Sequence, residues 1–413
     1  MFSRPSCIAF LALAASIISV SATPSISLEV IGGLPIFLSL WDVHTDQSSG
    51  PVSVNDIVDL KVTTIIRNTG DETLTLLEDP HGALSTFPAD TFVITNANGT
   101  SPNFTGYMIK FSPEDAAENG ETITLAPGEF KAVEHDLSET YNFAASGAGM
   151  YNIEAYNVFI AVKDKKLGPI RAISKALSVR ISGRLTLSTV VHTTSNPGHP
   201  AFEGCSAKQQ QVVLVAAKAA QDYANEAYAY LLSDPEPTPR FTTWFGASED
   251  GYATVLDHFE KIREEDFTSF TYHCTELGCR GNAVYAYVKA DEYGVVHLCR
   301  AFWRAPLTGT NSKGGTLVHE VSHFLDVAST KDVPIGNSTT RAYYGHKLCK
   351  ELALNMPEKA IINADNHEYF AENNPAQLVD GLEVELNSAS LAGINACLSP
   401  FNSLASCHGS DYL

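Results

Sequence analysis

The chain has 413 residues, of which 44% are hydrophobic and 18% are charged. This length is typical of two or three domains, and the composition is that of globular rather than disordered proteins. Lysine and arginine number 27 against 47 aspartates and glutamates, so the formal net charge is −20. Such a charge repels phosphate backbones and anionic lipid surfaces, which argues against nucleic-acid and membrane partners and admits a cationic partner.

Residues 1–22 have the features of a secretory signal peptide. Arg4 precedes an apolar run from Cys7 to Val20, and small residues at 20–22 offer a cleavage site. The run is shorter than a membrane-spanning helix requires. We therefore expect a secreted, extracellular protein. Export makes three sequons meaningful as signals of surface loops: Asn98, Asn103 and Asn337.

Residues 23–182 have the period-two pattern of β-strands and contain no cysteine. Apolar residues alternate with others over Val58–Ile66 and Leu177–Ile181, and turn sequences such as Ala126-Pro127-Gly128 fall between such runs. The pattern predicts an all-β, sandwich-like region of about seven or more strands. The polar stretch 183–202 that follows is typical of a linker or processing region.

The second half changes to a helical period. Ser206 and Gln209 form a capping-box pattern before a long amphipathic run that ends near Asp234-Pro235. A second helix is expected around residues 255–262, strand-like runs follow at Asn282–Lys289 and Val295–Trp303, and helical patterns return from Thr316. These alternations predict an α+β domain over residues 203–377, with a C-terminal extension over 378–413.

Seven cysteines remain once the signal peptide is removed, all of them in the second half. An oxidising compartment would pair most of them, so we interpret them as structural staples rather than metal ligands or nucleophiles. Seven is odd, so one is left over, and the connectivity cannot be read from sequence. The seven are Cys205, Cys274, Cys279, Cys299, Cys349, Cys397 and Cys407.

The catalytic chemistry is indicated by the run His319-Glu320-Val321-Ser322-His323. Residues four apart on a helix share a face, so His319 and His323 can both present a ring nitrogen to one Zn²⁺. Glu320 lies beside them, placed to take a proton from metal-bound water. Gly314-Gly315 just before the run permits a close approach to a neighbouring element. The sequence therefore predicts one zinc ion per chain at this helix.

A tetrahedral catalytic zinc needs a third protein ligand, and several positions after His323 are candidates. The metzincin arrangement needs a histidine at position 329, where this chain has serine. Glu351 on a later helix would give a thermolysin-like site. Asp326, three residues after His323, is more typical of a supporting or solvated residue. Asp332 lies in a turn-forming stretch that could fold back on the helix.

The motif and its surroundings resemble the deuterolysin-type (aspzincin) metallopeptidases. His319–Phe324 followed by Thr330-Lys331-Asp332 matches their metal-binding pattern, and Asn363–Asn373 resembles one branch, the fungal peptidyl-Lys metalloendopeptidases. The likeness covers roughly residues 202–377. Further matching runs occur in one order at Gly204–Ser206, Thr238–Gly246, Cys299–Trp303 and Ala305-Pro306.

The resemblance implies the roles of the site residues. Zinc would be held by His319, His323 and Asp332, with Glu320 as general base. The family places a tyrosine that steadies the tetrahedral intermediate three residues after the aspartate. This chain has Ile335 there, and Tyr344, after an insertion, is the candidate for that role. The resemblance also implies two disulfides, Cys205–Cys274 and Cys279–Cys299.

A lysine pocket is the second implication. Asp365 and Glu368 stand three apart on an expected helix, so their carboxylates face the same way. In the resembling branch these positions accept the ammonium of the lysine just after the scissile bond. Two carboxylates favour a slender cation, and lysine suits such a pocket better than the wider arginine fork. A solvated acidic helix face is the alternative interpretation of this pair.

Maturation is the third implication, because the mature enzymes of the family begin near the position of Phe202. The β-rich residues 23–182 would then be a pro-region that is removed. The expected fold is an α+β zincin-like metallopeptidase domain preceded by an all-β sandwich-like pro-region.

The expected function is that of a secreted, monomeric zinc metalloendopeptidase that hydrolyses lysine-containing proteins and peptides on the amino side of lysine. Three alternatives stay open. They are a broad-specificity deuterolysin-like peptidase, a thermolysin-like peptidase that uses Glu351 as a ligand, and a non-catalytic secreted β-sandwich binding protein.

Overall fold

The computed structural model describes residues 25–32, 52–187, 201–233, 238–247, 249–275, 279, 281–333, 345–377 and 383–384. The expected signal peptide and most of the linker and C-terminal extension lie outside these ranges. Among the described residues, none of the helices is long and apolar enough to cross a membrane.

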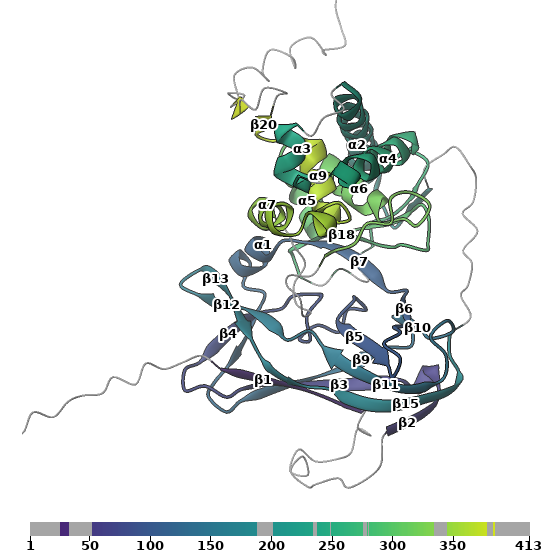
Figure 1. Cartoon of the computed structure of the whole chain (residues 1–413). Helices are drawn as coiled ribbons and strands as arrows, with labels where there is room; N and C mark the ends of the chain where they lie inside the picture. The colour runs from purple at the N-terminus through teal and green to yellow at the C-terminus, as the bar shows by residue number, and fades with distance from the viewer. Residues whose placement is uncertain are drawn as a thin grey trace, which may run out of the picture.

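The first half of the chain is built mainly from strands, which fill the lower part of Figure 1. One sheet has the order β14-β1-β3-β9, a second β2-β15-β11-β5, a third β13-β12-β4-β8, and a two-stranded sheet pairs β10 with β6. Their bounds are β1 Ile26–Gly32, β2 Val52–Asp56, β3 Lys61–Asn68, β4 Leu74–Leu77, β5 Phe92–Asn96, β6 Asn103–Phe104, β8 Thr122–Leu125, β9 Phe130–Asp136, β10 Tyr141–Asn142, β11 Gly149–Ala155, β12 Val158–Lys163, β13 Lys166–Arg171, β14 Ile173–Lys175 and β15 Leu177–Arg184.

The first two sheets share one hydrophobic core. Alternate residues of β1 and β3 are buried, as expected for strands with one apolar face. Val62 and Ile66 of β3 lie in the same cluster as Val179 and Ile181 of β15. Each such aliphatic side chain contributes roughly 1.5–3 kcal/mol when it is fully buried. The half therefore has a core of its own.

The expected strand pattern over Val58–Ile66 is only partly right. Residues Ile57–Asp59 form a turn of 3-10 helix, and β3 begins at Lys61. The side chain of Asp56 caps this turn by accepting a hydrogen bond from the amide of Val58. An aspartate at such a position favours a turn over continued pairing because its carboxylate satisfies a backbone amide locally.

The second half contains most of the helices, in the upper part of Figure 1. Ser206 and Gln209 form the expected capping box, with the Gln209 amide donating to Ser206 Oγ and the Ser206 amide to Gln209 Oε1. The helices are α2 Ala207–Ser233, α3 Pro239–Phe245, α4 Glu249–Glu264, α5 Arg300–Arg304, α6 Lys313–Ser322, α7 His346–Asn355, α8 Pro357–Ala360 and α9 Ala364–Glu372.

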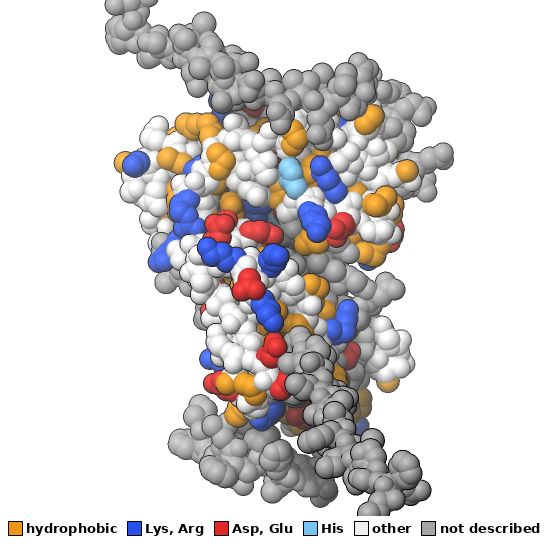
Figure 2. Space-filling view, turned by 90° about the vertical axis from the view of Figure 1, so that its left-hand side faces the viewer, with side chains coloured by type: hydrophobic (Ala, Val, Ile, Leu, Met, Phe, Trp, Pro, Cys, Tyr) orange, Lys and Arg blue, Asp and Glu red, His pale blue; other side chains and the backbone are white. Residues whose placement is uncertain are grey.

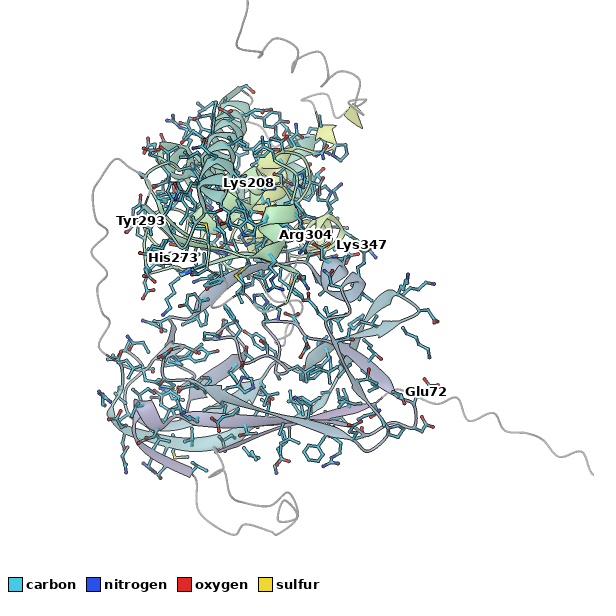
Figure 3. All side chains as sticks on the ribbon, turned by 180° about the vertical axis from the view of Figure 1, so that it is seen from behind. Glu72, Lys208, His273, Tyr293, Arg304 and Lys347 are labelled. Carbon is cyan, nitrogen blue, oxygen red and sulfur yellow. A yellow bond between two sulfur atoms is a disulfide. The ribbon has the colours of Figure 1, made fainter. Side chains whose placement is uncertain are left out.

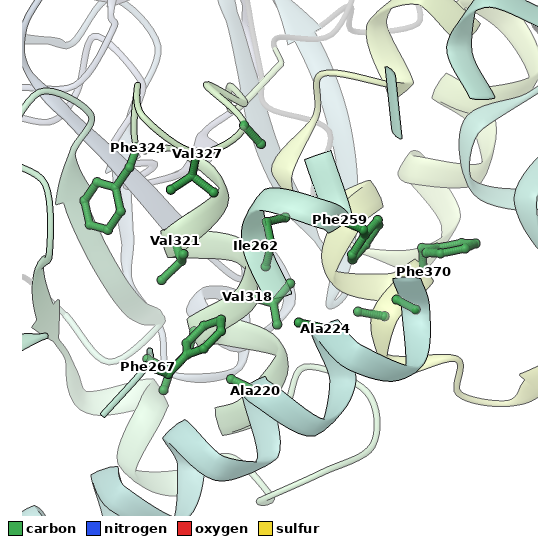
Figure 4. Close-up of a cluster of buried hydrophobic side chains, with 14 of the residues drawn as sticks. Ala220, Ala224, Phe259, Ile262, Phe267, Val318, Val321, Phe324, Val327 and Phe370 are labelled. Atoms are coloured by element: carbon green, nitrogen blue, oxygen red, sulfur yellow. The ribbon is translucent and has the colours of Figure 1, made fainter. Parts of the chain in front are cut away.

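Helix α6 lies at the centre of this half. Val318 and Val321 of α6 pack in one core with residues of α2, α4 and α9, such as Ala220, Phe259 and Phe370 (Figure 4). Glycine at 314 is required by the close approach of α2, because a Cβ there would lie 3.0 Å from the Cβ of Ala219. Helix α6 is therefore packed against three other helices.

A five-stranded sheet of order β16-β17-β19-β18-β7 adjoins these helices. Its strands are β16 Ala201–Glu203, β17 Thr271–His273, β18 Val284–Lys289, β19 Val295–Leu298 and β7 Tyr107–Phe111, and the short strands β20 Ala376–Gln377 and β21 Glu383–Val384 pair separately. The expected strand over Val295–Trp303 is wrong beyond Leu298, since the chain turns at Cys299 into α5. Cys299 is held there by a disulfide to Cys279.

Strand β7 belongs to the first half of the chain but pairs with the second. It runs antiparallel to β18, and Lys110 stands opposite Ala286 in the register. Helix α1, Pro113–Glu118, follows it at the junction between the halves (Figure 1). The sequence pattern predicts two separately folded halves. The structure instead joins them through one continuous sheet.

The negative charge of the chain is not gathered into one surface patch on the face shown in Figure 2, where acidic and basic side chains are interspersed. Five acidic side chains of the second half are instead largely removed from solvent. They are Glu320, Asp332, Asp365, Glu368 and Glu372.

Candidate active site

Helix α6 presents the two histidines of the motif on one side. It begins at its N-cap Ser312, whose hydroxyl accepts a hydrogen bond from the Gly315 amide at 2.9 Å, and His323 is its C-cap residue. His319 and His323 are fully buried, and their ring centroids are 4.9 Å apart. The four-residue spacing on a packed helix therefore aims both imidazoles at the same space.

Asp332 completes this group because the chain reverses after α6. Ser329 adopts a left-handed conformation with φ of 52° in the turn. The Thr330 carbonyl then lies 3.0 Å from His323 Nδ1, which leaves Nε2 of that ring directed at Asp332. Asp332 Oδ1 lies 3.3 Å from His319 Nε2 and 3.5 Å from His323 Nε2. The turn after α6 therefore folds back on the helix, as expected from the sequence.

These three residues fit a metal ion. One ligand atom from each of His319, His323 and Asp332 lies within 4.8 Å of the other two. Within the described part of the chain, Nε2 of both rings, Asp332 Oδ1 and both oxygens of Glu320 are buried without a hydrogen-bond partner. Buried polar atoms without partners are costly, so a cation and its water are the natural way to satisfy this cluster. Two imidazoles and a carboxylate are a ligand set typical of zinc.

The protonation behaviour of the cluster has clear physical causes. Burial raises the pKa of Glu320 to about 8, with the positive charge of His319 working in the opposite direction. Burial also lowers the pKa of His323. Burial alone would raise the pKa of Asp332. The charge of His323 and the contacts of the carboxylate with His319, His323 and His81 outweigh burial and hold this pKa well below the ordinary value. Titratable groups whose pKa values are shifted by burial and by neighbouring charges are typical of functional sites.

Glu351 is not near this cluster. It lies exposed on α7 and pairs with Lys347 at 3.9 Å, and Figure 3 places Lys347 on the helical half. The thermolysin-like alternative is therefore not favoured, because the half-exposed side chain of Glu351 points to solvent whereas both histidine rings are fully buried. Asp326 is also exposed, as expected of a solvated residue. Tyr344, the candidate for the oxyanion role, lies outside the described residues.

A second acidic cluster lies beside the first. Asp365 and Glu368 stand on α9 and are almost completely buried, so the interpretation as a solvated acidic face is wrong. His319 Nδ1 lies 2.9 Å from Asp365 Oδ1 and 3.4 Å from Glu368 Oε2. The imidazole of His319 thus connects the two clusters, with one nitrogen toward each. A carboxylate on Nδ1 fixes the ring orientation and leaves Nε2 as a ligand atom.

The side chain that occupies the second cluster comes from the first half of the chain. Lys110 Nζ lies 2.5 Å from Glu368 Oε2 and 3.5 Å from Asp365 Oδ1, and its side chain is 3% exposed. Burial alone would lower the pKa of Lys110, but the charges of Asp365 and Glu368 outweigh it and raise that pKa. The ammonium is therefore present as a buried cation between two carboxylates.

Sequence reasoning missed the contribution of the first half to this region. The amide of Ile109 donates to Asp332 Oδ2 at 2.8 Å, and His81 Nε2 lies 3.8 Å from the same oxygen. Lys110 is one lysine within an otherwise apolar strand, Tyr107-Met108-Ile109-Lys110-Phe111. A buried lysine inside an apolar strand was the available signal, because such a residue needs a partner. The partner itself lies more than 250 residues away in sequence.

The described residues contain two disulfides, both in the second half of the chain. The structure joins Cys205 to Cys274 and Cys279 to Cys299, the two pairs that the resemblance implies. Cys349 is buried on α7 and belongs to neither. Cys397 and Cys407 lie outside the described residues.

Comparison with known proteins shows the family of the chain. A family model described as lysine-specific metallo-endopeptidase, of the aspzincin family, matches residues 230–372. The peptidyl-Lys metalloendopeptidase of Grifola frondosa is 43% identical over 372 residues, which cover 89% of this chain and 98% of the relative. That of Armillaria mellea is 39% identical, covering 91% of this chain and all of the relative.

One solved structure, a zinc peptidase from Grifola frondosa, is 46% identical and matches with a TM-score of 0.39 over 42% of this chain and all of its own length. The two peptidyl-Lys relatives match this chain across nearly their whole length, first half included. The non-catalytic alternative is therefore not favoured. The chain belongs to the aspzincin family of metallopeptidases and is a metalloendopeptidase.

Proposed function

We propose that this protein is a secreted zinc metalloendopeptidase that cleaves peptide bonds on the amino side of lysine and is made as a latent precursor. The observation that carries the specificity is the buried carboxylate pair Asp365 and Glu368, which adjoins the histidine cluster through His319. Two relatives of nearly full coverage are named peptidyl-Lys metalloendopeptidases, which supports the same specificity here.

One zinc ion per chain would be held by His319, His323 and Asp332. The unpartnered buried atoms of these residues and their mutual distances support this ligand set. When bound, zinc acts as a Lewis acid that polarises a carbonyl and acidifies a water molecule. Two neutral imidazoles and one carboxylate would neutralise only part of the charge of a bound zinc ion. The remaining positive charge would favour the ionised form of Glu320.

Glu320 is the proposed general base. Its carboxylate is fully buried next to His319 on the same helix, with both oxygens available to a water molecule. It takes the proton of the attacking water and later delivers it to the nitrogen of the leaving amine, so one group serves as base and then as acid. Tyr344 is proposed as the donor that supports the developing oxyanion, a contribution of about 2.7–4 kcal/mol where such a donor has been removed.

Asp365 and Glu368 would bind the lysine that follows the scissile bond. Two carboxylates at the end of a buried pocket compensate the cost of desolvating one ammonium group. A neutral side chain would gain no such charge interaction and would leave both carboxylates buried without a counter-charge. Tyr285 and Tyr369 flank the same space, with ring centroids 5.3 and 5.6 Å from the ammonium of Lys110. Aromatic faces near a cation add a favourable electrostatic contribution and narrow the pocket.

The precursor would consist of a signal peptide over residues 1–22, a sandwich-like all-β pro-region over 23–182 and a linker over 183–202. The catalytic domain over 203–377 and a C-terminal extension over 378–413 would follow. The separate core of the first half and its lack of cysteine support this division. The native active enzyme should begin between about Gly183 and Glu203, and an active secreted form that begins at Thr23 would contradict the proposal.

A peptide-library experiment tests the proposed activity. The processed protein is incubated with mixed peptides, with and without a chelator, and the new termini are read by mass spectrometry. We expect termini that begin with lysine, few that begin with arginine, and no cleavage in the chelator. Cleavage without regard to lysine would favour the remaining alternative, a broad-specificity deuterolysin-like peptidase.

A further inference from the structure

We infer that strand β7 of the first half occupies the substrate cleft of the second half as a built-in substrate mimic, with Lys110 filling the lysine pocket. The inference rests on the proposed lysine specificity and names what keeps the precursor latent. It assigns a function to Lys110 and to the sheet that joins the two halves. The partner that fits the cleft is an extended strand with one lysine, and the chain supplies that strand itself.

The pairing of β7 is the first observation. β18 is the last strand of the sheet that the second half builds from its own residues, and β7 extends that sheet by one antiparallel strand. The order of the sheet shows that without β7 the backbone of β18 would have an unpaired edge. Peptides commonly bind to such edges by strand addition, because backbone hydrogen bonds give affinity and alternate side chains enter pockets.

Successive side chains of β7 enter different apolar clusters. Ile109 and Phe111 lie in a cluster at the junction of the halves, with Leu77 and Phe87 of the first half and Val284 and Tyr287 of the second. Met108 instead belongs to the large core of the second half. Lys110 shares a face with Met108, because successive side chains of a strand alternate. The register of β7 is thus fixed by both halves at once, and it delivers Lys110 to the carboxylates.

The backbone of β7 places a peptide bond at the histidine cluster. The amide of Ile109 faces away from β18 and donates to Asp332 Oδ2 at 2.8 Å. The N–H and C=O groups of one residue in an extended strand point to the same edge, so the Ile109 carbonyl also faces the cluster. That carbonyl belongs to the bond just before Lys110. Cleavage on the amino side of lysine requires that the lysine lies in the pocket while the carbonyl before it faces the metal ligands. Lys110 and the Ile109 carbonyl have this arrangement.

Several polar groups surround the ammonium of Lys110. Besides the two carboxylates, Asn311 Oδ1 lies 3.5 Å from Nζ. Gly345 donates its amide to Asp365 Oδ2 at 2.9 Å, and Tyr369 donates its hydroxyl to Asn311 Oδ1 at 2.7 Å. These bonds orient the acceptors that surround the cation. A substrate lysine must therefore displace Lys110 before it can bind.

A competition experiment on the full-length chain tests this directly. All proteins carry Glu320→Gln, so that no chain can cut itself, and are loaded with zinc. A short fluorescent peptide with a single lysine is the probe. We expect weak binding to the parent and binding about tenfold tighter or more to Lys110→Met, because that substitution removes the cation that competes for the pocket.

Lys166→Met is the matched control, since Lys166 is an exposed lysine on β13 of the first half. It should bind the probe like the parent. Equal binding by the parent and by Lys110→Met, with tight binding once the first half has been removed, would overturn the inference. Failure of the isolated second half to prefer the lysine probe over a norleucine probe would instead contradict the proposed specificity.

Amine acetylation of the wild-type full-length protein gives a second measurement that needs no variant at Lys110. We expect Lys110 to react at least about tenfold more slowly than Lys166, because its amine is buried and paired. After processing, once the first half has left the active site, Lys110 should react as fast as Lys166. Equal reaction of Lys110 and Lys166 in the intact chain would contradict the inference.

Discussion

The histidine cluster and the lysine pocket lie side by side, yet their polar groups are satisfied in opposite ways. In the first, buried atoms of His319, His323, Asp332 and Glu320 have no hydrogen-bond partner within the described residues. In the second, Asp365 and Glu368 hold the ammonium of Lys110. One cluster is therefore suited to a ligand from outside the chain, whereas the other already holds a cation from the chain itself.

This comparison makes separate predictions for the two clusters, because the first should control catalysis and the second the choice of substrate. For enzyme assays, a cleavage site for an unrelated protease placed within residues 188–200 would allow every variant to be processed alike. Activity, zinc content and cleavage preference are then measured on the same sample.

The largest effect is expected for Glu320→Gln. The glutamine can hydrogen-bond a water molecule but cannot accept its proton, so turnover should fall by about 10²–10⁴-fold. Zinc content and the unfolding curve should stay as in wild type. Glu351→Gln is the control, because that glutamate is exposed on α7 and should leave turnover unchanged. Substantial residual activity in Glu320→Gln would assign the base to another residue.

Removal of a proposed ligand should have the next largest effect. Asp332→Ala deletes the only carboxylate of the three-residue set, so zinc content and activity should be lost together. Asp326→Ala, an exposed aspartate three residues after His323, should keep both. Zinc content by atomic spectroscopy after dialysis is the measurement. An Asp332→Ala protein that retains a full equivalent of zinc would show that the ligand set is wrong.

Substitutions in the pocket should change specificity more than catalysis. The double variant Asp365→Asn, Glu368→Gln keeps the shape of the pocket but removes both charges. We expect the preference for lysine over norleucine after the scissile bond to fall by about 10–100-fold, the scale of one or two charge-assisted contacts. Zinc content is measured alongside because His319 touches both carboxylates. An unchanged preference with zinc in place would contradict the assignment of the pocket.

The smallest effect is expected at the support of His323. Thr330 is fully buried, and its hydroxyl lies 2.6 Å from Ser322 Oγ and 3.2 Å from His323 Nδ1. Thr330→Val should weaken zinc binding by about tenfold, which is at the low end of the effects usual for residues that support a metal ligand. The effect should be small because the backbone carbonyl of Thr330 still contacts the ring of His323. Thr308→Val removes the hydroxyl of an exposed threonine and serves as the control. Zinc affinity measured with a competing chelator distinguishes the two.

The sequence was most informative where function depends on neighbours along one helix. The spacing of His319 and His323 and that of Asp365 and Glu368 can be read directly, because residues three or four apart must share a face. The choice of Asp332 over Glu351 needed a family resemblance, since a turn after a helix can fold in several ways. Strand limits were less certain wherever a side chain could cap a turn, as Asp56 does.

The connection between the halves could not be predicted from one sequence. The pairing of β7 with β18 joins segments more than 170 residues apart, and the strand pattern of Tyr107–Phe111 says nothing about which edge it will meet. The occupant of the lysine pocket depends on that pairing. Local patterns encode elements, whereas such long-range contacts come from the packing of the whole chain.

The most direct test of the proposed lysine-directed activity is the cleavage pattern of the processed, zinc-loaded enzyme on a peptide library in which only the residue after the scissile bond varies. We predict that nearly all new amino termini begin with lysine, with arginine far behind. We also predict that Asp365→Asn with Glu368→Gln erases this bias while zinc stays bound. A wild-type enzyme that cuts before lysine no more often than before neutral residues would contradict the role of the buried carboxylates.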